Sequence, residues 1–528
     1  MDVQAHRLAT GARWFAIAVG IALVLGFILR LKGIHDPIFD HPNWRQGDEA
    51  AIARNFAERF FNPLYPQTNY DGPPPNYVEL ELQIVPFLAA TLYKIFGVHE
   101  IFGRLLTIAS SLGTVATLAL FGRWLFNSAL AGAAAAFAYA IAPGAVYYGR
   151  TFTPDATMVF FLTAALYAGA RMLVEDEALA WRRVAGATAL LAVAYLAKPV
   201  SLVALLPLAA IALARWRNGR TMPLAQLAVY FLAPLAVLWA YQHDVASHAE
   251  WHWSSGIMTV HVVPLLLAAL TNGDAFVAKL GTFWEMLGLL SRTMLGWPAT
   301  IVSIAGLALL PFAQARSRSL LWTWLAGGLA YVFVVVTYET VDYYMLLLLP
   351  LAALIIGLVV RTAADAVLRL DERSATKAAL VGAAALAIAG TTAQSIAASA
   401  PYYAYNKQAY RNAIALAQTL DPDALVVIGH YGPDVLYYMR RFGWEEDPAL
   451  WRPFDQKSAM RKGARYYVSI EDLRTRRNPA LCAWLGSFPL LERSGATWPV
   501  YVTDNARRLA KPRPCVPAPP APADLTAR

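Results

Sequence analysis

The stretch WFAIAVGIALVLGFILRL, residues 14–31, decides the fold class. It is an apolar run about as long as a helix needs to cross the hydrocarbon core of a bilayer, and Arg7 and Arg13 precede it. A cleaved signal peptide has a shorter apolar core and a small-residue cleavage site, whereas this run ends at Arg30 and Lys32. We therefore interpret it as a retained first membrane span that begins in the cytoplasm.

Apolar runs of similar length recur through most of the chain. Of the 528 residues, 58% are hydrophobic and only 15% are charged, whereas about a quarter of a soluble domain is charged. Lipid offers peptide groups no hydrogen-bond partners, so such runs are expected to form helices. We predict an α-helical polytopic membrane protein with about 11 spans, near residues 14–31, 102–121, 129–146, 156–170, 184–197, 202–214, 224–241, 301–312, 320–337, 344–360 and 378–397.

The basic residues between these runs give the spans a direction. Lys and Arg cluster near residues 123, 171–183, 215–220, 316–318 and 361–377. With a cytoplasmic N-terminus and alternating spans, all these clusters fall on one side, as the positive-inside rule requires. Much of the net charge of +9 therefore belongs to loops beside anionic lipid, which argues against a nucleic-acid partner. A first segment at about 33–83 and a middle segment at about 242–297 are then expected outside.

The composition changes near residue 401 to that of a soluble domain. Residues 425–429 and 465–469 have the pattern of buried strands, and 433–441 has that of a helix. We therefore predict a transmembrane module at 1–400 and a small α/β domain at 401–510, outside the membrane.

The end of the chain differs again. Residues 511–528 are rich in proline and are expected to form a disordered tail. The two cysteines, Cys482 and Cys515, both lie in the C-terminal part. An extracytoplasmic location permits a disulfide between them, and two unrelated thiols are the alternative.

The first outer segment holds the densest group of ionisable residues. Arg45, Asp48 and Glu49 open an amphipathic helical stretch. A carboxylate near a helix N-terminus is stabilised by the helix dipole, so capping alone could explain the two acids. The other reading is that they carry chemistry.

Two more acids, Glu79 and Glu81, precede the apolar stretch 84–96, which is long enough only for a juxtamembrane helix. Solvation at the membrane interface is the simple explanation for either acid. Their position directly outside the membrane also makes them candidates for a site.

Further candidates lie at the outer ends of later spans. Arg150 and Lys198 are cations on the side where basic residues are depleted, so we expect anionic partners such as lipid headgroups, with snorkelling as the alternative. Asp155 follows shortly after Arg150 in the sequence. A later pair of spans meets on the same side at a carboxylate and two aromatic rings: Asp342, Tyr343 and Tyr344. The two tyrosines could also be the aromatic residues that are common at a membrane interface.

Motifs for cofactors are weak or missing. The segment after residue 241 contains His and acidic residues that resemble metal ligands only superficially, because no second anchored cluster accompanies them: His243, Asp244, His248, Glu250 and His252. We predict no metal site from these residues, no certain cofactor, and leave a divalent cation open. The sequence has neither a Walker-type phosphate loop nor a nucleophilic serine motif, so nucleotide-driven chemistry has no visible machinery.

The candidate residues occur in a recognisable order. Residues 44–56 read Trp-Arg-Gln-x-Asp-x-Ala-x-Ile-Ala-Arg-Asn-Phe, and Gly149-Arg150, Pro154-Asp155, Lys198-Pro199 and Asp342-Tyr343-Tyr344 follow. This order resembles the glycosyltransferase C (GT-C) superfamily, in particular bacterial relatives of protein O-mannosyltransferases and of the lipid A aminoarabinose transferase (families 39 and 83). The resemblance covers roughly the N-terminal 360 residues.

The resemblance implies a polyprenyl-phosphate or polyprenyl-diphosphate sugar as donor and a hydroxyl on a lipid, glycan or protein as acceptor. It implies that Asp48 is the catalytic base, that Glu81 is a second acidic site residue, and that Arg150 and Lys198 hold the lipid phosphate. Arg45 would support the loop. Glu49, Glu79, Asp155, Asp342, Tyr343 and Tyr344 complete the expected substrate-binding set.

A base opposite a phosphate leaving group implies a single displacement with inversion. The expected location is the bacterial inner membrane, with the site on the extracytoplasmic face. Gln83 stands where relatives often have proline, and Asp342 stands where they often have histidine.

Other functions fit parts of the same pattern. A lipid-sugar flippase or transporter would use Arg150 and Lys198 to conduct a headgroup, but it predicts polar residues deep in several spans. A glycan polymerase or ligase would place its catalytic residues in the middle segment, 242–297. A structural assembly role for the C-terminal domain would leave the acids of the first segment unexplained.

Overall fold

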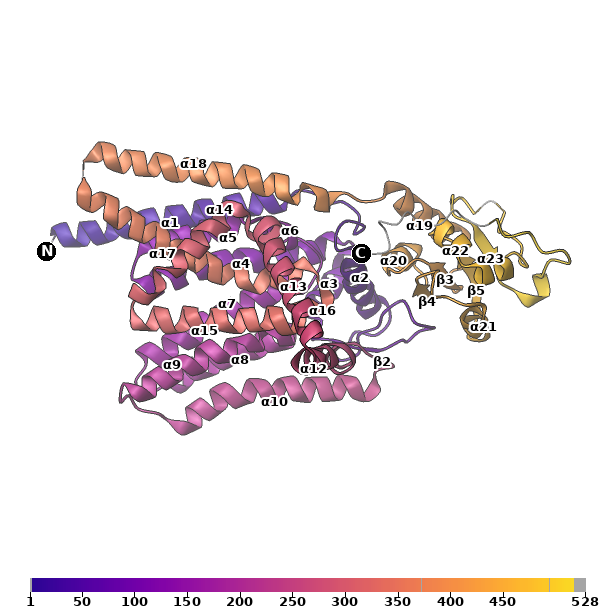
Figure 1. The fold of residues 1–528 in the computed structure, drawn as a ribbon, viewed down its shortest axis with the longest axis horizontal. Coiled ribbons are helices and arrows are strands. Elements are labelled where there is room, and N and C mark those ends of the chain that lie inside the picture. Colours follow the sequence, from indigo (N-terminus) through magenta and orange to yellow (C-terminus); the bar gives the residue numbers. More distant parts are fainter. Residues whose placement is uncertain (1, 372, 493, 517–528) are drawn as a thin grey trace.

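The computed structural model describes residues 2–371, 373–492 and 494–516, and consists of a long helical bundle with a small α/β domain at one end (Figure 1). The two parts confirm the predicted fold class. The bundle helices are α1 (Asp2–Arg30), α4 (Ile101–Phe126), α5 (Ala129–Ile141), α7 (Asp155–Glu175), α8 (Trp181–Ala197), α9 (Leu205–Arg217), α10 (Leu224–His248), α14 (Trp297–Leu307), α15 (Ala315–Tyr331), α17 (Leu349–Leu370) and α18 (Ser374–Ser399).

By length and composition, nine helices in the described part of the chain can cross a membrane. The predicted spans at α5 and α14 are shorter apolar helices, of 13 and 11 residues, and α8 has 17 residues. The predicted span 129–146 is divided because Pro143, which cannot donate a backbone hydrogen bond, begins the separate helix α6 (Pro143–Tyr148). All of these helices belong to the same bundle (Figure 1).

The depth of each helix in the bundle follows its contacts. The apolar window within Asp342–Leu370 is 78% buried, whereas the window within Ser374–Tyr403 is only 6% buried. Asp342–Leu370 therefore lies at the centre of the bundle. Helix α18 lies on its edge, as Figure 1 shows. Close crossings depend on small residues: a Cβ on Gly132 of α5 would lie 2.2 Å from the carbonyl oxygen of Ala119 on α4.

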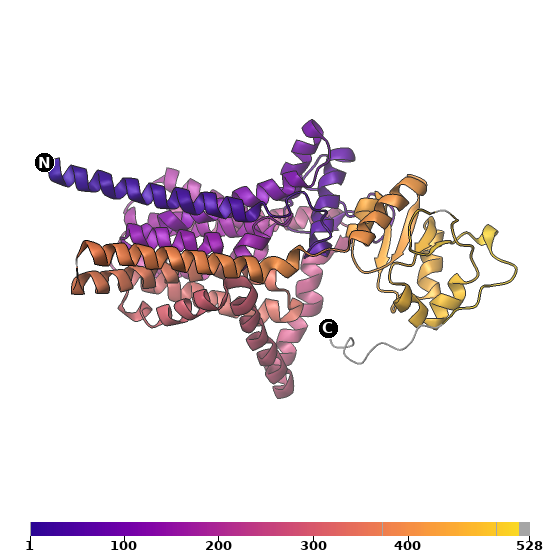
Figure 2. The same ribbon diagram turned by 90° about the horizontal axis from the view of Figure 1, so that it is seen from above.

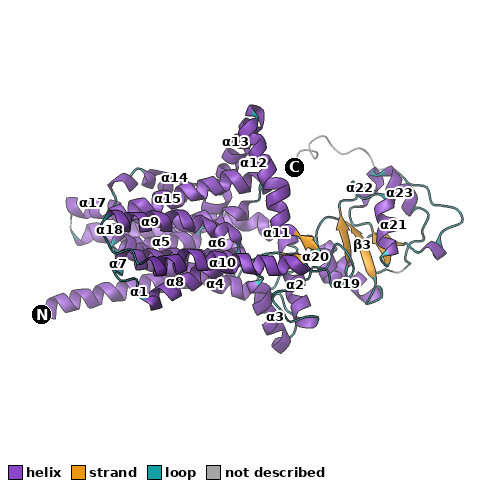
Figure 3. Cartoon of the chain, turned by 90° about the horizontal axis from the view of Figure 1, so that it is seen from below, coloured by secondary structure: helices purple, strands orange, loops and turns teal. Residues whose placement is uncertain are grey.

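The middle segment is more helical and more apolar than expected. It forms α11 (Trp253–Gly256), α12 (Val263–Thr271) and α13 (Gly273–Leu289), and Trp253–Thr271 meets the length and composition of a span although the sequence analysis did not predict one there. Figures 2 and 3 show α12 and α13 running across the bundle axis near the α/β domain. These helices therefore project from the bundle instead of extending it.

Two short helices lie at the end of the bundle next to the α/β domain (Figure 1). α2 (Asn43–Glu58) is buried over most of its length although its sequence is largely polar, and α3 (Ile84–Phe96) is the predicted juxtamembrane helix. Strand β1 (Val78–Glu79) pairs in parallel with β2 (Trp251–His252), which ties the first outer segment to the middle one.

The C-terminal domain is a mixed sheet covered by helices. Strands β4 (Gly443–Glu446), β3 (Leu425–Gly429) and β5 (Ala464–Val468) are parallel, and β6 (Val500–Val502) adds antiparallel to β5. The helices around the sheet are α19 (Lys407–Thr419), α20 (Asp434–Met439), α21 (Pro453–Arg461), α22 (Asp472–Arg477) and α23 (Pro479–Leu485).

The end of this domain is better ordered than the sequence analysis expects. Cys482 of α23 and Cys515 form a disulfide, which decides between the two alternatives for the cysteines. Arg513 donates its backbone N–H to the carbonyl of Gly486 at 2.9 Å. The predicted disordered tail therefore does not begin at residue 511, and its remainder, 517–528, lies outside the described residues.

The sheet edge at β4 is docked on the first outer segment. Gly72 donates its backbone N–H to Gly443 at 2.9 Å, and Gly443 donates to Asn69 at 3.0 Å. A Cβ on Gly47 would lie 2.7 Å from the backbone nitrogen of Asp434, so α2 and α20 can approach this closely only with glycine. The α/β domain is therefore packed directly against α2 and the first outer segment.

Candidate active site

Helix α2 places three ionisable side chains on one buried face. Arg45 lies 3.8 Å from Asp48 and 3.0 Å from Glu49, at the i+3 and i+4 positions, and it also pairs with Glu81 from the segment before α3. Asp48 and Glu49 are 1% and 0% exposed. Both lie in the second turn of α2, beyond the first turn where a cap or the helix dipole would act, so capping does not explain them.

A second group approaches from the bundle. Lys198, at the end of α8, pairs with Asp155 at 2.6 Å, and its ammonium lies 4.5 Å from the centre of the Tyr344 ring and 5.4 Å from that of Tyr343. The peptide nitrogen of Leu82 donates to the carbonyl of Leu196 at 2.9 Å, which joins the backbone next to Glu81 to the backbone before Lys198.

The two groups form one candidate site. Lys198 is close enough to Glu81 and Arg45 for both to act on it electrostatically, and Asp155 acts on Glu49 in the same way. We name this set the acidic cluster: Arg45, Asp48, Glu49, Glu81, Asp155, Lys198, Tyr343 and Tyr344. The structure thus brings together residues that are far apart in the sequence.

Burial changes the protonation of the two acids on α2. It raises the pKa of Asp48 to about 7, against the opposing effects of Arg45 and Tyr70. It raises the pKa of Glu49 to about 8, again against Arg45. Asp48 can therefore gain and lose a proton near neutral pH, whereas Glu49 is mostly protonated there.

The raised pKa of Asp48 predicts a pH dependence for any reaction in which Asp48 is the base. Only its deprotonated form can accept a proton, so kcat/KM should rise about tenfold per pH unit below about pH 7 and level off above it. Initial rates measured from about pH 5.5 to about pH 8.5 would test this, with thermal denaturation at each pH as the control for folding. A flat profile would contradict the assignment.

Arg150 is not part of the acidic cluster. It is fully buried, pairs with Asp40, and donates to the carbonyl of Gly33 at 3.2 Å. Arg104 reaches the other oxygen of Asp40 at 3.1 Å. Arg150 therefore has a partner within the protein, the Asp40 carboxylate, which also binds Arg104; contact with a lipid phosphate stays a prediction.

Two other predicted residues also bind neighbouring segments. Asp342 accepts hydrogen bonds from Tyr148 and Tyr402. Glu79 accepts from the Ser255 hydroxyl at 2.6 Å, which fixes the middle segment over β1. Neither belongs to the acidic cluster.

Sequence reasoning missed an aromatic group beside Asp48. The Trp44 ring lies 6.3 Å from Tyr70, 6.2 Å from Trp253 and 6.4 Å from Tyr431, and its stacking with Tyr431 is nearly parallel at 21°. These rings, named the aromatic cluster, come from the first segment, the middle segment and the α/β domain. A signal existed for Tyr431, because it follows β3 at the carboxyl end of a parallel sheet, where ligands commonly bind.

The histidines after residue 241 do not assemble into a metal site. His248 stacks on Tyr65 at 4.0 Å, and His243 stacks on Trp239 at 5.2 Å. Across the residues that the structure describes, no group of three or more His, Cys, Asp or Glu could hold a metal ion. In the acidic cluster, Arg45 supplies the positive charge between the carboxylates.

Comparison with known proteins shows which folds the chain resembles. Residues 83–241 match the family described as dolichyl-phosphate-mannose-protein mannosyltransferase. No curated protein matches the sequence. The crystal structure of ArnT from Cupriavidus metallidurans bound to undecaprenyl phosphate is similar with a TM-score of 0.58, at 14% identity, over 94% of this chain and 99% of that one.

A second similar structure is the oligosaccharyltransferase AglB from Archaeoglobus fulgidus, in complex with an inhibitory peptide and a dolichol-phosphate. Its TM-score is 0.56 at 13% identity, over 94% of this chain and 75% of that one. Both are GT-C glycosyltransferases. The chain has the GT-C fold. Helix α2, which carries Asp48 and Glu49, lies at the end of the bundle that faces the α/β domain (Figure 1).

Proposed function

We propose that the chain is a membrane glycosyltransferase that moves a sugar from a polyprenyl-phosphate or polyprenyl-diphosphate donor to an acceptor hydroxyl. The observation that carries this proposal is the buried Asp48, which lies 3.8 Å from Arg45 in the same cluster as the Lys198–Asp155 pair. Sugar transfer from a phosphate requires a base for the acceptor hydroxyl and a cation for the departing phosphate, and this cluster contains candidates for both. The solved relatives with undecaprenyl phosphate and dolichol-phosphate support the donor class.

The proposed reaction is a single displacement. Asp48 takes the proton of the acceptor hydroxyl while the hydroxyl oxygen forms a bond to the anomeric carbon. The bond between that carbon and the phosphate oxygen breaks, and its electron pair leaves with the polyprenyl phosphate. Lys198 stabilises the negative charge on the departing phosphate. Attack from the side opposite the leaving group inverts the anomeric centre.

The remaining members of the acidic cluster position these two groups. Arg45 binds Glu49 and Glu81 and so fixes the face of α2 that presents Asp48. Asp155 orients Lys198. The resemblance implies that Arg150 binds the lipid phosphate, but we propose a structural role for it instead. Arg150 pairs with Asp40 and donates to the carbonyl of Gly33, so it holds the start of the first outer segment.

The orientation follows from the basic loops. Helix α2, which carries Asp48 and Glu49, lies at the end of the bundle next to the α/β domain, whereas the basic loop between α9 and α10 lies at the opposite end (Figure 1). By the positive-inside rule the basic end is cytoplasmic. We therefore place the site and the α/β domain on the extracytoplasmic face of a bacterial inner membrane.

The aromatic cluster is the proposed platform for the sugar ring of donor or acceptor. Replacing Tyr431 by alanine removes a ring that packs on Trp44. Because stacking of an aromatic ring contributes about 1 kcal/mol, we expect KM for one substrate to rise about fivefold to tenfold with kcat little changed. Phe454→Ala, at an exposed ring of the same domain, is the matched control. A fall in kcat alone would contradict a binding role.

Transfer by the purified protein tests the proposed function directly. The protein in nanodiscs is mixed with a synthetic polyprenyl-phosphate sugar and candidate acceptors, and mass spectrometry detects the glycosylated product. A flippase would instead move the labelled lipid across sealed vesicles without forming a product. A polymerase or ligase with its catalytic residues in 242–297 would lose activity on substitution there and keep it on substitution of Asp48.

A further inference from the structure

The α/β domain carries a hollow of about 750 Å³ that no part of the proposed reaction uses. It lies between α21, the start of β5 and the residues after β6. The sheet order β4-β3-β5-β6 places it at the edge opposite β4, which is the edge docked on the first outer segment. The hollow is therefore separate from the acidic cluster and open to the medium.

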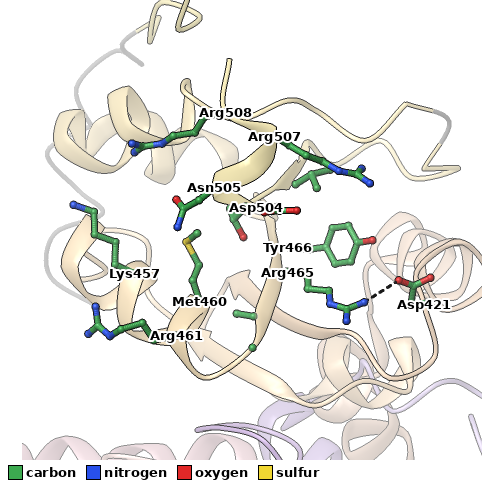
Figure 4. A pocket seen from close by; sticks show the side chains of 14 residues that line it. Asp421, Lys457, Met460, Arg461, Arg465, Tyr466, Asp504, Asn505, Arg507 and Arg508 are labelled. Carbon is green, nitrogen blue, oxygen red and sulfur yellow. Dashed lines mark hydrogen bonds and ion pairs between the residues drawn. The ribbon is translucent and has the colours of Figure 1, made fainter. Parts of the chain in front are cut away.

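Its lining is strongly basic. The cationic side chains are Lys457, Arg461, Arg465, Arg507 and Arg508, and the only acids in the lining are Asp421 and Asp504. Figure 4 shows the head groups of Lys457, Arg461 and Arg508 on one side of the hollow and those of Arg465 and Arg507 on the other.

The two acids do not balance these charges. Asp421 pairs with Arg465 at 3.3 Å, and Asp504 accepts from the backbone of Ala506 at 2.9 Å. Within the described chain no ion pair is formed by Lys457, Arg461 or Arg507. Cations gathered in a concave surface repel one another and concentrate a positive potential there. Their arrangement does not stabilise the domain, so it favours a bound anion.

A neutral group in the lining also lacks a partner. Thr503 is 1% exposed, and its hydroxyl has no hydrogen-bond partner among the described residues. A buried hydroxyl without a partner costs stability, so a ligand that bonds to it would compensate for that cost. Asn505 and Tyr466 add an amide and a phenol ring to the same hollow.

We propose that this basic hollow binds an acidic glycan, a saccharide chain that carries carboxylate or phosphate groups at intervals. The cations on its two sides suit charges that are spaced along a chain, and the hollow is far larger than a single phosphate ion. The hydroxyl, amide and phenol groups suit sugar hydroxyls and a sugar ring face. Few apolar side chains line the hollow, which disfavours a lipid tail. This inference does not depend on the proposed transfer reaction.

Binding to the full chain in nanodiscs tests the proposal. The probe is fluorescently labelled hexagalacturonate, and maltohexaose of the same length is the neutral comparison. Arg461→Glu combined with Arg507→Glu should weaken hexagalacturonate binding at least about tenfold, and added NaCl should weaken binding to the natural chain. Lys407→Glu combined with Arg411→Glu on α19 changes the net charge equally at exposed positions outside the hollow, and should leave binding unchanged.

A second variant separates binding from folding. Thr503→Val keeps the shape of the side chain and removes only the hydroxyl, so the domain should remain folded while affinity falls about threefold to tenfold. Equal binding of maltohexaose, an equal loss in the α19 variant, or no loss in the Arg461 and Arg507 variant would overturn the proposal. Preference for monomeric short-chain phosphatidylglycerol or for inorganic phosphate over hexagalacturonate would overturn it in favour of a lipid or a free anion.

Discussion

Replacing Asp48 by asparagine should lower kcat/KM for sugar transfer about 1,000-fold, within the range for loss of a general base. Asparagine has nearly the same shape but cannot take the acceptor proton. The protein should still fold, because burial raises the pKa of Asp48 to about 7. An acid with a raised pKa binds its proton more tightly in the folded state, so its stability contribution falls as the pH rises from about 4 to about 7. At pH 8 the variant should therefore be at least as stable as the natural chain.

Glu49→Gln is the matched control for this prediction. Glu49 neighbours Asp48 and is equally buried, but its pKa of about 8 means that it is already mostly protonated at pH 7. Glutamine mimics that protonated form, so transfer at pH 7 should change less than about fivefold. Steady-state kinetics and thermal denaturation of both variants would check these expectations. A fully active Asp48→Asn protein, or equal losses in the two variants, would contradict the role of Asp48 as the base.

Replacing Asp40 by asparagine should destabilise the protein by about 3–5 kcal/mol. Asp40 is fully buried and pairs with Arg104 and Arg150, which are also fully buried. Without the carboxylate, two guanidinium groups remain in the interior with no charge to balance them. Denaturation of the protein in nanodiscs or detergent, by heat or by a denaturing detergent, measures the loss.

The same substitution at an exposed ion pair provides the comparison. Asp365 pairs with Arg361 at 3.4 Å, and its side chain is 53% exposed, so Asp365→Asn should cost less than about 0.5 kcal/mol. The two variants also separate the possible roles of Arg150. If Arg150 bound the donor phosphate, Asp40→Asn would leave stability unchanged and alter KM for the donor instead.

Much of the acidic cluster was predictable because helical spacing is visible in the sequence. Asp48 and Glu49 lie one helical turn after Arg45, so a helix that buries Arg45 brings both acids to the same face. Lys198 was recognisable as a cation on the side predicted to be outside, where few occur. The sequence could not show that Asp155 would be its partner, because their segments meet only in the packed bundle.

Contacts between distant parts of the chain explain what the sequence did not show. Arg150 resembled a free cation because its partner, Asp40, lies 110 residues earlier in the chain. Tyr431 was not among the predicted residues, because its stacking with Trp44 depends on how the α/β domain docks. α12 and α13 resembled interrupted spans because hydropathy measures length and composition, and it does not give the angle to the bundle axis.

The sequence by itself determined that this chain forms membrane helices followed by an α/β domain, and it predicted a direction for those helices. Apolar length and basic loops are local properties, and lipid requires that a spanning backbone satisfy its own hydrogen bonds. Tertiary structure alone decided which charges meet. It placed Arg45, Asp48 and Glu81 with Lys198 and Asp155, and it left Arg150 bound to Asp40. The energy of a buried charge depends on its neighbours within a few ångströms, and those neighbours come from distant parts of the chain.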